Sequence, residues 1–208
     1  MRLGLVLVVS AVVSLGWVMR PVHPVAAQKS VNLPEYTADG QMVAPKNYRE
    51  WIFLTSGFDM TYRERAGAPD HSVFDNVFVN PEAYQSFLAT GTWPDKTIMV
   101  LENRSAEAKD GVIVKGGRFQ NTSIDGMEIH VKDSARFKRE GPNGSWGFFD
   151  VEKGKGTPFP ATASCFACHE AHAAVDTTFV QFYPTLLPIA EAKKTFSDAY
   201  VKDRASAK

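Results

Sequence analysis

The sequence predicts an α+β fold, in which an antiparallel β-sheet carries flanking helices. Short runs rich in β-branched and aromatic residues follow one another along most of the chain, with little helical pattern between them. This strand-rich pattern also argues against a four-helix bundle. Consecutive strands without long crossovers pair as antiparallel neighbours, and the few helices then pack against the sheet.

The first elements lie in the N-terminal half of the chain. Residues 51–55 and 72–79 are apolar and rich in strand-forming residues, so each run predicts a strand. Asn80 and Pro81, followed by an acid, are typical of a helix start, because Asn caps the first turn and Pro fits the first helical position. This helix is expected to end near Gly91.

Strands dominate the middle of the chain. They are predicted at residues 97–102, 112–114, 127–131 and 145–151, with a bend or bulge at Gly116-Gly117. Asp133 is expected to cap a short helix that runs through Phe137. Residues 153–160 are rich in Gly, Pro and Lys and predict a loop. A helix beginning at Ser164 and a last helix over residues 188–200 complete the pattern.

The chain is expected to divide into three parts. Residues 1–27 have a basic start, an apolar run and small residues before Gln28, which is typical of an export signal; a retained membrane anchor is the alternative. Residues 28–46 are polar with scattered prolines and predict an extended lead-in. Residues 47–208 then form one domain, large enough to bury a core. Export would place this domain outside the cytoplasm, which in a bacterium means the periplasm.

The charge balance argues against a nucleic-acid partner. The chain has 23 basic and 23 acidic residues. Removal of residues 1–27, which contain Arg2 and Arg20 and no acid, leaves a net charge of about −2. A domain of that charge attracts neither nucleic acid nor an anionic membrane surface.

A short run near the C-terminus carries the chemistry. The two cysteines of the chain lie in Cys165-Phe166-Ala167-Cys168-His169, which is the C-x-x-C-H attachment signature of a c-type haem. The thiols of Cys165 and Cys168 add across the porphyrin vinyl groups, and His169 ligates the iron from one side. The run therefore predicts one covalent haem c, held by two thioethers.

Three plainer interpretations of the cysteines compete with this one. A disulfide would suit an exported protein. A thioredoxin-like redox pair usually follows the first strand of a βαβ pattern, and no such pattern precedes Cys165. A zinc site would need a second pair of ligands, and the sequence offers none at metal spacing. The adjacent His169 and the export signal favour haem.

The far side of the iron is predicted to be vacant or occupied by water. Small electron-transfer cytochromes c place a methionine ligand downstream of the haem motif, but no methionine follows His169. His172 lies three residues after His169, on the same side of a helix, so it cannot reach the opposite face. His71 falls in a loop and His130 in a strand, where both are expected to be surface or core residues. The remaining candidates are the upstream methionines, Met42, Met60, Met99 and Met127.

Several stretches together resemble the cytochrome P460 family, which includes the cytochromes c′-β. They cover most of the chain after the signal and occur in one order: residues 45–51 (PKNYREW), 77–82 (VFVNPE), 91–97 (GTWPDKT), 131–137 (VKDSARF), 165–169 (CFACH) and 182–184 (FYP). The resemblance implies a homodimer in which each subunit has an antiparallel sheet, flanking helices and one haem. A redox partner such as another cytochrome is a further implication.

The resemblance also exposes a departure at Leu101. In the P460 branch, a lysine that precedes a glutamate on the strand after the Trp-Pro-Asp turn forms a second covalent link to the porphyrin. Here the matching pair is Leu101-Glu102, so the amine is absent. Met99 and Leu101 alternate onto one face of their strand, which predicts an apolar wall of the haem pocket.

The distal side of the haem is expected to hold a carboxylate and phenylalanines. By the resemblance, an acid of the P460 branch matches Glu128, and a basic position falls on Asp75. Glu128 would accept a proton from hydroxylamine if an apolar pocket raised its pKa; a solvated strand glutamate is the alternative. Cytochromes c′-β cap the iron with phenylalanines instead, for which the candidates are Phe58, Phe74 and Phe119.

Three functions follow from these observations. The leading one is a haem protein that binds NO or a related molecule such as CO, because His169 is fixed and Leu101 replaces the crosslinking lysine. The second is an oxidoreductase that acts on hydroxylamine or on nitrogen oxides, with Glu128 as a catalytic residue. A plain electron carrier is the third.

Overall fold

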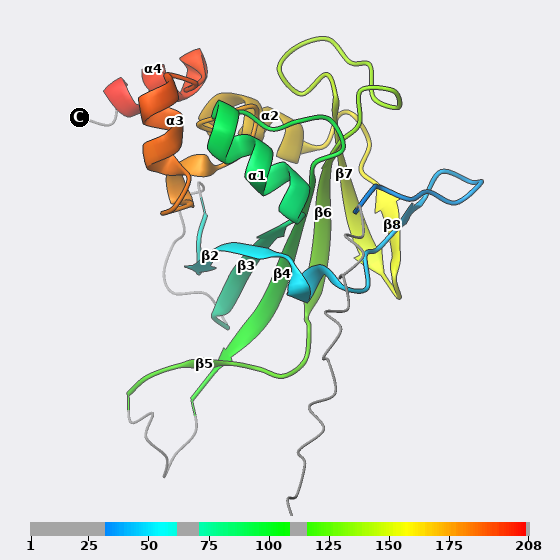
Figure 1. Cartoon of the computed structure of the whole chain (residues 1–208). Helices are drawn as coiled ribbons and strands as arrows, with labels where there is room; N and C mark the ends of the chain where they lie inside the picture. Colours follow the sequence, from blue (N-terminus) through cyan, green and yellow to red (C-terminus); the bar gives the residue numbers. More distant parts are fainter. Residues whose placement is uncertain (1–31, 62–70, 109–115, 207–208) are drawn as a thin grey trace, which may run out of the picture. The chain divides into compact units, whose positions relative to one another are not determined.

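The computed structural model describes residues 32–61, 71–108 and 116–206 (Figure 1). The predicted export signal at residues 1–27, the first part of the lead-in and the predicted strand at 112–114 lie outside these ranges. None of the helices within the described ranges is long and apolar enough to cross a membrane.

One antiparallel sheet forms the centre of the domain. Its strands lie in the order β1-β8-β7-β6-β4-β3-β2, and β5 pairs with the end of β4. Every strand pair is antiparallel. The strands are β1 (Met42–Val43), β2 (Ile52–Phe58), β3 (Val73–Val79), β4 (Ile98–Glu107), β5 (Phe119–Gln120), β6 (Gly126–Lys132), β7 (Trp146–Glu152) and β8 (Lys155–Pro158).

Helices occupy one region beside this sheet (Figure 1). They are α1 (Pro81–Thr90), α2 (Ser164–His172), α3 (Leu187–Lys193) and α4 (Asp198–Ser206), with the short 3₁₀ turn η2 (Val180–Phe182). A second 3₁₀ turn, η1 (Tyr48–Glu50), lies in the segment that leads into β2. Sheet and helices together confirm the predicted α+β class and exclude a four-helix bundle.

The two faces of the sheet bury different clusters. On one face, Met99 and Trp146 pack with residues of α1, α3 and η2. On the other face, Val100 and Ile129 pack under the segment that leads into β2, which contributes Tyr48. Both clusters draw on β4, because successive side chains of a strand point to opposite faces. The first face is the one that carries the cavity described below.

Helix α1 begins and ends where the sequence predicts, but its first turn is held differently. Pro81 opens the helix and Gly91 closes it with a φ of +77°, a left-handed conformation that favours glycine. The Asn80 side chain makes no cap hydrogen bond. Its Oδ1 instead accepts the backbone N–H of Ile98 at 2.8 Å, which ties the start of α1 to the start of β4.

Three other elements differ from their predictions. The predicted loop at 153–160 contains β8, which follows a tight turn with positive φ at Lys153 and Gly154. The segment after Asp133 forms a hydrogen-bonded turn rather than a helix. The predicted helix at 188–200 divides into α3 and α4, because Lys194 adopts a left-handed φ of +59° that ends α3.

Candidate functional site

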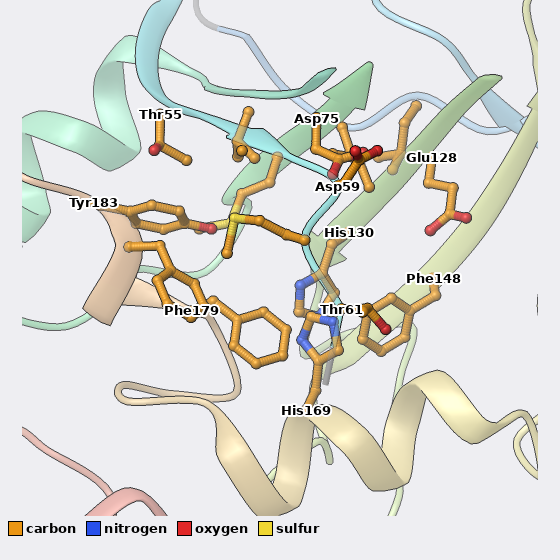
Figure 2. Close-up of a pocket in the computed structure, with 17 residues that line it drawn as sticks. Thr55, Asp59, Thr61, Asp75, Glu128, His130, Phe148, His169, Phe179 and Tyr183 are labelled. Carbon is orange, nitrogen blue, oxygen red and sulfur yellow. The ribbon is translucent and has the colours of Figure 1, made fainter. Parts of the chain in front are cut away.

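A cavity of about 570 Å³ opens on the face of the sheet that carries the first cluster (Figure 2). Strands β2, β3, β4, β6 and β7 supply one side, and α2 with the segment through η2 supplies the other. Most of its surface is apolar. Its lining residues are Thr55, Gly57, Asp59, Met60, Thr61, Asp75, Val77, Met99, Leu101, Glu128, Ile129, His130, Phe148, His169, Phe179, Phe182 and Tyr183.

Strand register explains why the sheet side chains meet in this cavity. Val77, Leu101 and Glu128 are direct neighbours across β3, β4 and β6. Met99, His130 and Phe148 form the next row across β4, β6 and β7. Because alternate residues of a strand share a face, both rows point into the same space. Leu101 and Met99 thus form part of an apolar wall.

His169 enters the cavity from α2, opposite the sheet (Figure 2). Its Nδ1 donates to the backbone carbonyl of Thr177 at 2.6 Å, so Nε2 keeps the lone pair that a metal ligand needs. The ring is held by aromatic neighbours, with Phe179 at 4.5 Å, Phe148 at 4.7 Å and His130 at 5.0 Å between centroids. Burial lowers the pKa of His169 to about 4, which keeps the imidazole neutral near pH 7.

Cys165 and Cys168 lie on the same helix as His169. They are half-buried and form no disulfide, and burial raises the pKa of the Cys165 thiol. Cys165 lies four residues before His169, so these two side chains share one side of α2, whereas Cys168 directly precedes His169 and points in a different direction. Of these three side chains only His169 lines the cavity, so the donor that α2 offers at this wall is one imidazole.

Comparison with known proteins assigns the chain to a family. The family model for cytochrome P460 matches residues 45–180, which is more than half of the chain. No curated protein matches the sequence. The chain belongs to the cytochrome P460 family. Membership implies a c-type haem.

The cavity and His169 fit a haem, while Cys165 and Cys168 lie on the same helix as His169 without lining the cavity. The cavity volume lies in the usual range for cofactor sites of roughly 300–1,000 Å³. His169 offers a neutral imidazole oriented by a carbonyl acceptor, which is how metal-ligating histidines are usually held. The apolar wall of Val77, Met99 and Leu101 suits the face or edge of a porphyrin.

His130 is a cavity residue that the sequence analysis treated as an ordinary surface or core histidine. Its ring stacks on Phe148 at 3.9 Å and meets the His169 ring in a T-shaped contact. Its Nε2 is buried and has no hydrogen-bond partner in the described ranges. Burial lowers the pKa of His130 well below its usual value, so the ring is neutral. Its alternation with Glu128 along the strand was the signal that could have placed it here.

The phenylalanine candidates are corrected by the structure. Phe58 and Phe74 contact each other at 5.1 Å, on the opposite face of the sheet from the cavity. Each is one residue away from a lining residue, Gly57 and Asp75, and a shift of one residue turns a side chain to the other face. Phe119, on β5, is also not a lining residue. The cavity takes its phenylalanines from other positions, Phe148, Phe179 and Phe182.

The methionines divide between the two faces. Met42 and Met127 pack in the core on the far side of the sheet. Met60 and Met99 line the cavity. A Cβ atom on Gly57 would clash with the Met60 sulfur, so the glycine leaves the space that this thioether occupies over β2. Met60 therefore enters the cavity because residue 57 has no side chain.

Carboxylates form the polar part of the cavity wall. Asp75 accepts a hydrogen bond from Asn103 Nδ2 at 2.5 Å. Glu128 faces the cavity next to Leu101 (Figure 2). Burial raises the pKa of Glu128, and the negative charges of Asp150 and Asp75 raise it further. Glu128 therefore holds a proton at a higher pH than a solvated glutamate does.

The raised pKa of Glu128 predicts a pH-dependent effect of Glu128→Gln. Between the usual glutamate pKa and the raised one, the folded protein binds a proton that the unfolded chain releases, so the wild type loses stability as pH rises through this window. The glutamine variant has no such group to titrate, so its free energy of unfolding in urea should gain on that of the wild type as the pH rises above the usual glutamate pKa. Asp150→Asn should shrink the gain by removing one of the charges. A gain that is the same at every pH would contradict the assignment.

Proposed function

We propose that this protein is an exported c-type haem protein that binds small molecules such as NO or CO at an open iron site. Cys165 and Cys168 hold one haem through thioethers, and His169 ligates its iron. The haem supplies an iron with one position for a diatomic ligand. Residues 1–27 support export, and the periplasm is the proposed location.

One observation carries the open site. Among the described lining residues, His130 is the only other histidine. Its ring makes a T-shaped contact with the His169 ring, with the two centroids 5.0 Å apart, which leaves no room for a porphyrin between the rings. His130 therefore lies beside the iron ligand rather than across from it, and a bis-histidine haem is disfavoured.

The optical spectrum of the reduced holoprotein tests this proposal. We expect the broad bands of five-coordinate high-spin haem, and we expect CO and NO to convert them at once to the spectra of their complexes. Sharp α and β bands in both oxidation states, with slow CO binding, would mean a sixth protein ligand and would contradict the open site. Met60→Leu and Met99→Leu then identify that ligand, because both thioethers line the cavity.

A second candidate function is the oxidation of hydroxylamine. The observation that favours it is Glu128, whose raised pKa and place in the cavity wall suit a proton acceptor. Steady turnover of hydroxylamine with an electron acceptor, lost in Glu128→Gln while CO binding persists, would place this function first. A strongly red-shifted Soret band would reveal a second covalent link and would contradict the proposed consequence of Leu101.

A further inference from the structure

A tight turn carries the carbonyl group that orients His169. Val175 and Thr178 pair through two backbone hydrogen bonds, of 2.8 and 3.3 Å, and the two residues between them are Asp176 and Thr177. Both have left-handed backbones, with φ of +48° and +59°. Two-residue turns of this kind normally use Asn or Gly, and a β-branched residue at positive φ is an outlier. The backbone is thus strained at Thr177, the residue whose carbonyl accepts the hydrogen bond from His169.

Strain of this kind persists only where the surroundings hold it. The Asp176 carboxylate accepts Lys132 Nζ at 2.5 Å and the Trp146 indole N–H at 3.3 Å. Lys132 also donates to the backbone carbonyl of Trp93 at 2.8 Å. On the other side of the turn, the Trp93 indole donates to Thr178 Oγ1 at 2.7 Å. Side chains from β6 and β7 and from the segment before β4 therefore fix the turn to the sheet.

The fixed turn delivers one acceptor to the iron ligand. The carbonyl of Thr177 accepts the His169 Nδ1 proton at 2.6 Å, a short hydrogen bond. A strong acceptor on the far nitrogen of a ligating histidine fixes its tautomer and ring plane and makes the other nitrogen a better donor to the metal. Thr177 is also 3% exposed, so water does not compete for this carbonyl from outside.

We propose that the Lys132–Asp176 ion pair, together with Trp146, is a positioning device that sets how strongly His169 donates to the haem iron. Lys132, Asp176 and Trp146 are positioning residues, since they act through the Thr177 carbonyl and His169. This inference rests on the proposed ligation of iron by His169. A well-held turn gives a strong hydrogen bond, an electron-rich imidazole and a low reduction potential, because electron donation favours ferric iron.

The test is Asp176→Ala, with Lys132→Met as an independent second variant. Both release the turn, so in the holoprotein the iron–histidine stretching vibration of the ferrous state should move to lower frequency and the reduction potential should rise. Thr177→Gly keeps the carbonyl and adopts positive φ without strain, so both readouts should stay at the wild-type value. Lys96→Met is the matched control, because it breaks a different Lys–Asp pair, with Asp133, at the same end of the sheet.

Two outcomes would overturn the inference. One is that Asp176→Ala loses stability as Lys96→Met does while the vibration and the potential remain unchanged. The other is that Lys132→Met and Asp176→Ala shift the potential in opposite directions. If the wild type itself proves six-coordinate, the open-site proposal fails, and the reduction potentials of the same variants still decide the role of the turn.

Discussion

Replacing Glu102 by alanine is expected to lower the free energy of unfolding by about 3 kcal/mol, the lower end of the cost of breaking a buried ion pair. Glu102 is 1% exposed and lies on β4, directly after Leu101 but on the opposite face. Its Oε1 accepts Arg104 Nε at 2.5 Å, and its Oε2 accepts Arg49 at 2.5 Å and the Tyr48 hydroxyl.

The size of this effect follows from what alanine leaves behind. Arg104 is 8% exposed and would keep its charge in the interior without a carboxylate. Three backbone carbonyls, those of Asn121, Thr122 and Ser123, would still accept its guanidinium, which is why the lower end of the range applies. Arg49 is half exposed, so the loss of its carboxylate partner costs less free energy because water can solvate its charge. The loss would also loosen β4 at the position where Leu101 lines the cavity.

Urea unfolding of the holoprotein measures this effect. Glu102→Gln keeps the shape and part of the hydrogen bonding, so its loss should fall between those of the wild type and of Glu102→Ala. Glu152→Ala is the control, because Glu152 is exposed on β7 and its removal should change stability by no more than about 0.5 kcal/mol. A Glu102→Ala protein as stable as this control would show that the contacts of Glu102 with Arg104, Arg49 and Tyr48 contribute nothing to the stability of the fold.

The strands were predictable because alternating apolar residues indicate both that a strand forms and which of its side chains share a face. The run that became β4 gave both the element and the face, so Met99 and Leu101 were expected together on one wall and both line the cavity. β8 was missed because its four residues, Lys155 to Pro158, offer almost no apolar surface and end in proline. Such a strand forms through its pairing with β7, which no local pattern reports.

The candidate site was predictable only for strand residues, whose side chains alternate between the two faces of the sheet. Asp75 and Glu128 line the cavity, while Phe58 and Phe74 fail by a single residue of register. His130 has the same parity as Glu128 and could have been inferred from it. Phe179 and Tyr183 flank the short η2 turn, where no repeating pattern links a residue to a face. Their placement depends on tertiary packing against the sheet.

Replacing both Cys165 and Cys168 by alanine is expected to abolish covalent haem attachment. In the proposed function these two thiols make all the covalent bonds between chain and porphyrin. Leu101, which lines the cavity, has no amine that could form another bond. Acid–acetone extraction should therefore remove all haem from the double variant and none from the wild type. Mass spectrometry of the denatured chain should show haem on each single variant, since one thioether remains.

His169→Ala separates the tether from the iron ligand. The thioethers do not depend on the imidazole once they have formed, so this variant should keep its haem through extraction while its ferrous spectrum loses the signature of histidine ligation. Retention of haem by the double cysteine variant would point to another nucleophile on the chain and would overturn the interpretation of Leu101. Loss of haem from His169→Ala alone would instead mean that the imidazole is needed for attachment itself, because the thiols then react only with a haem that His169 already holds in place.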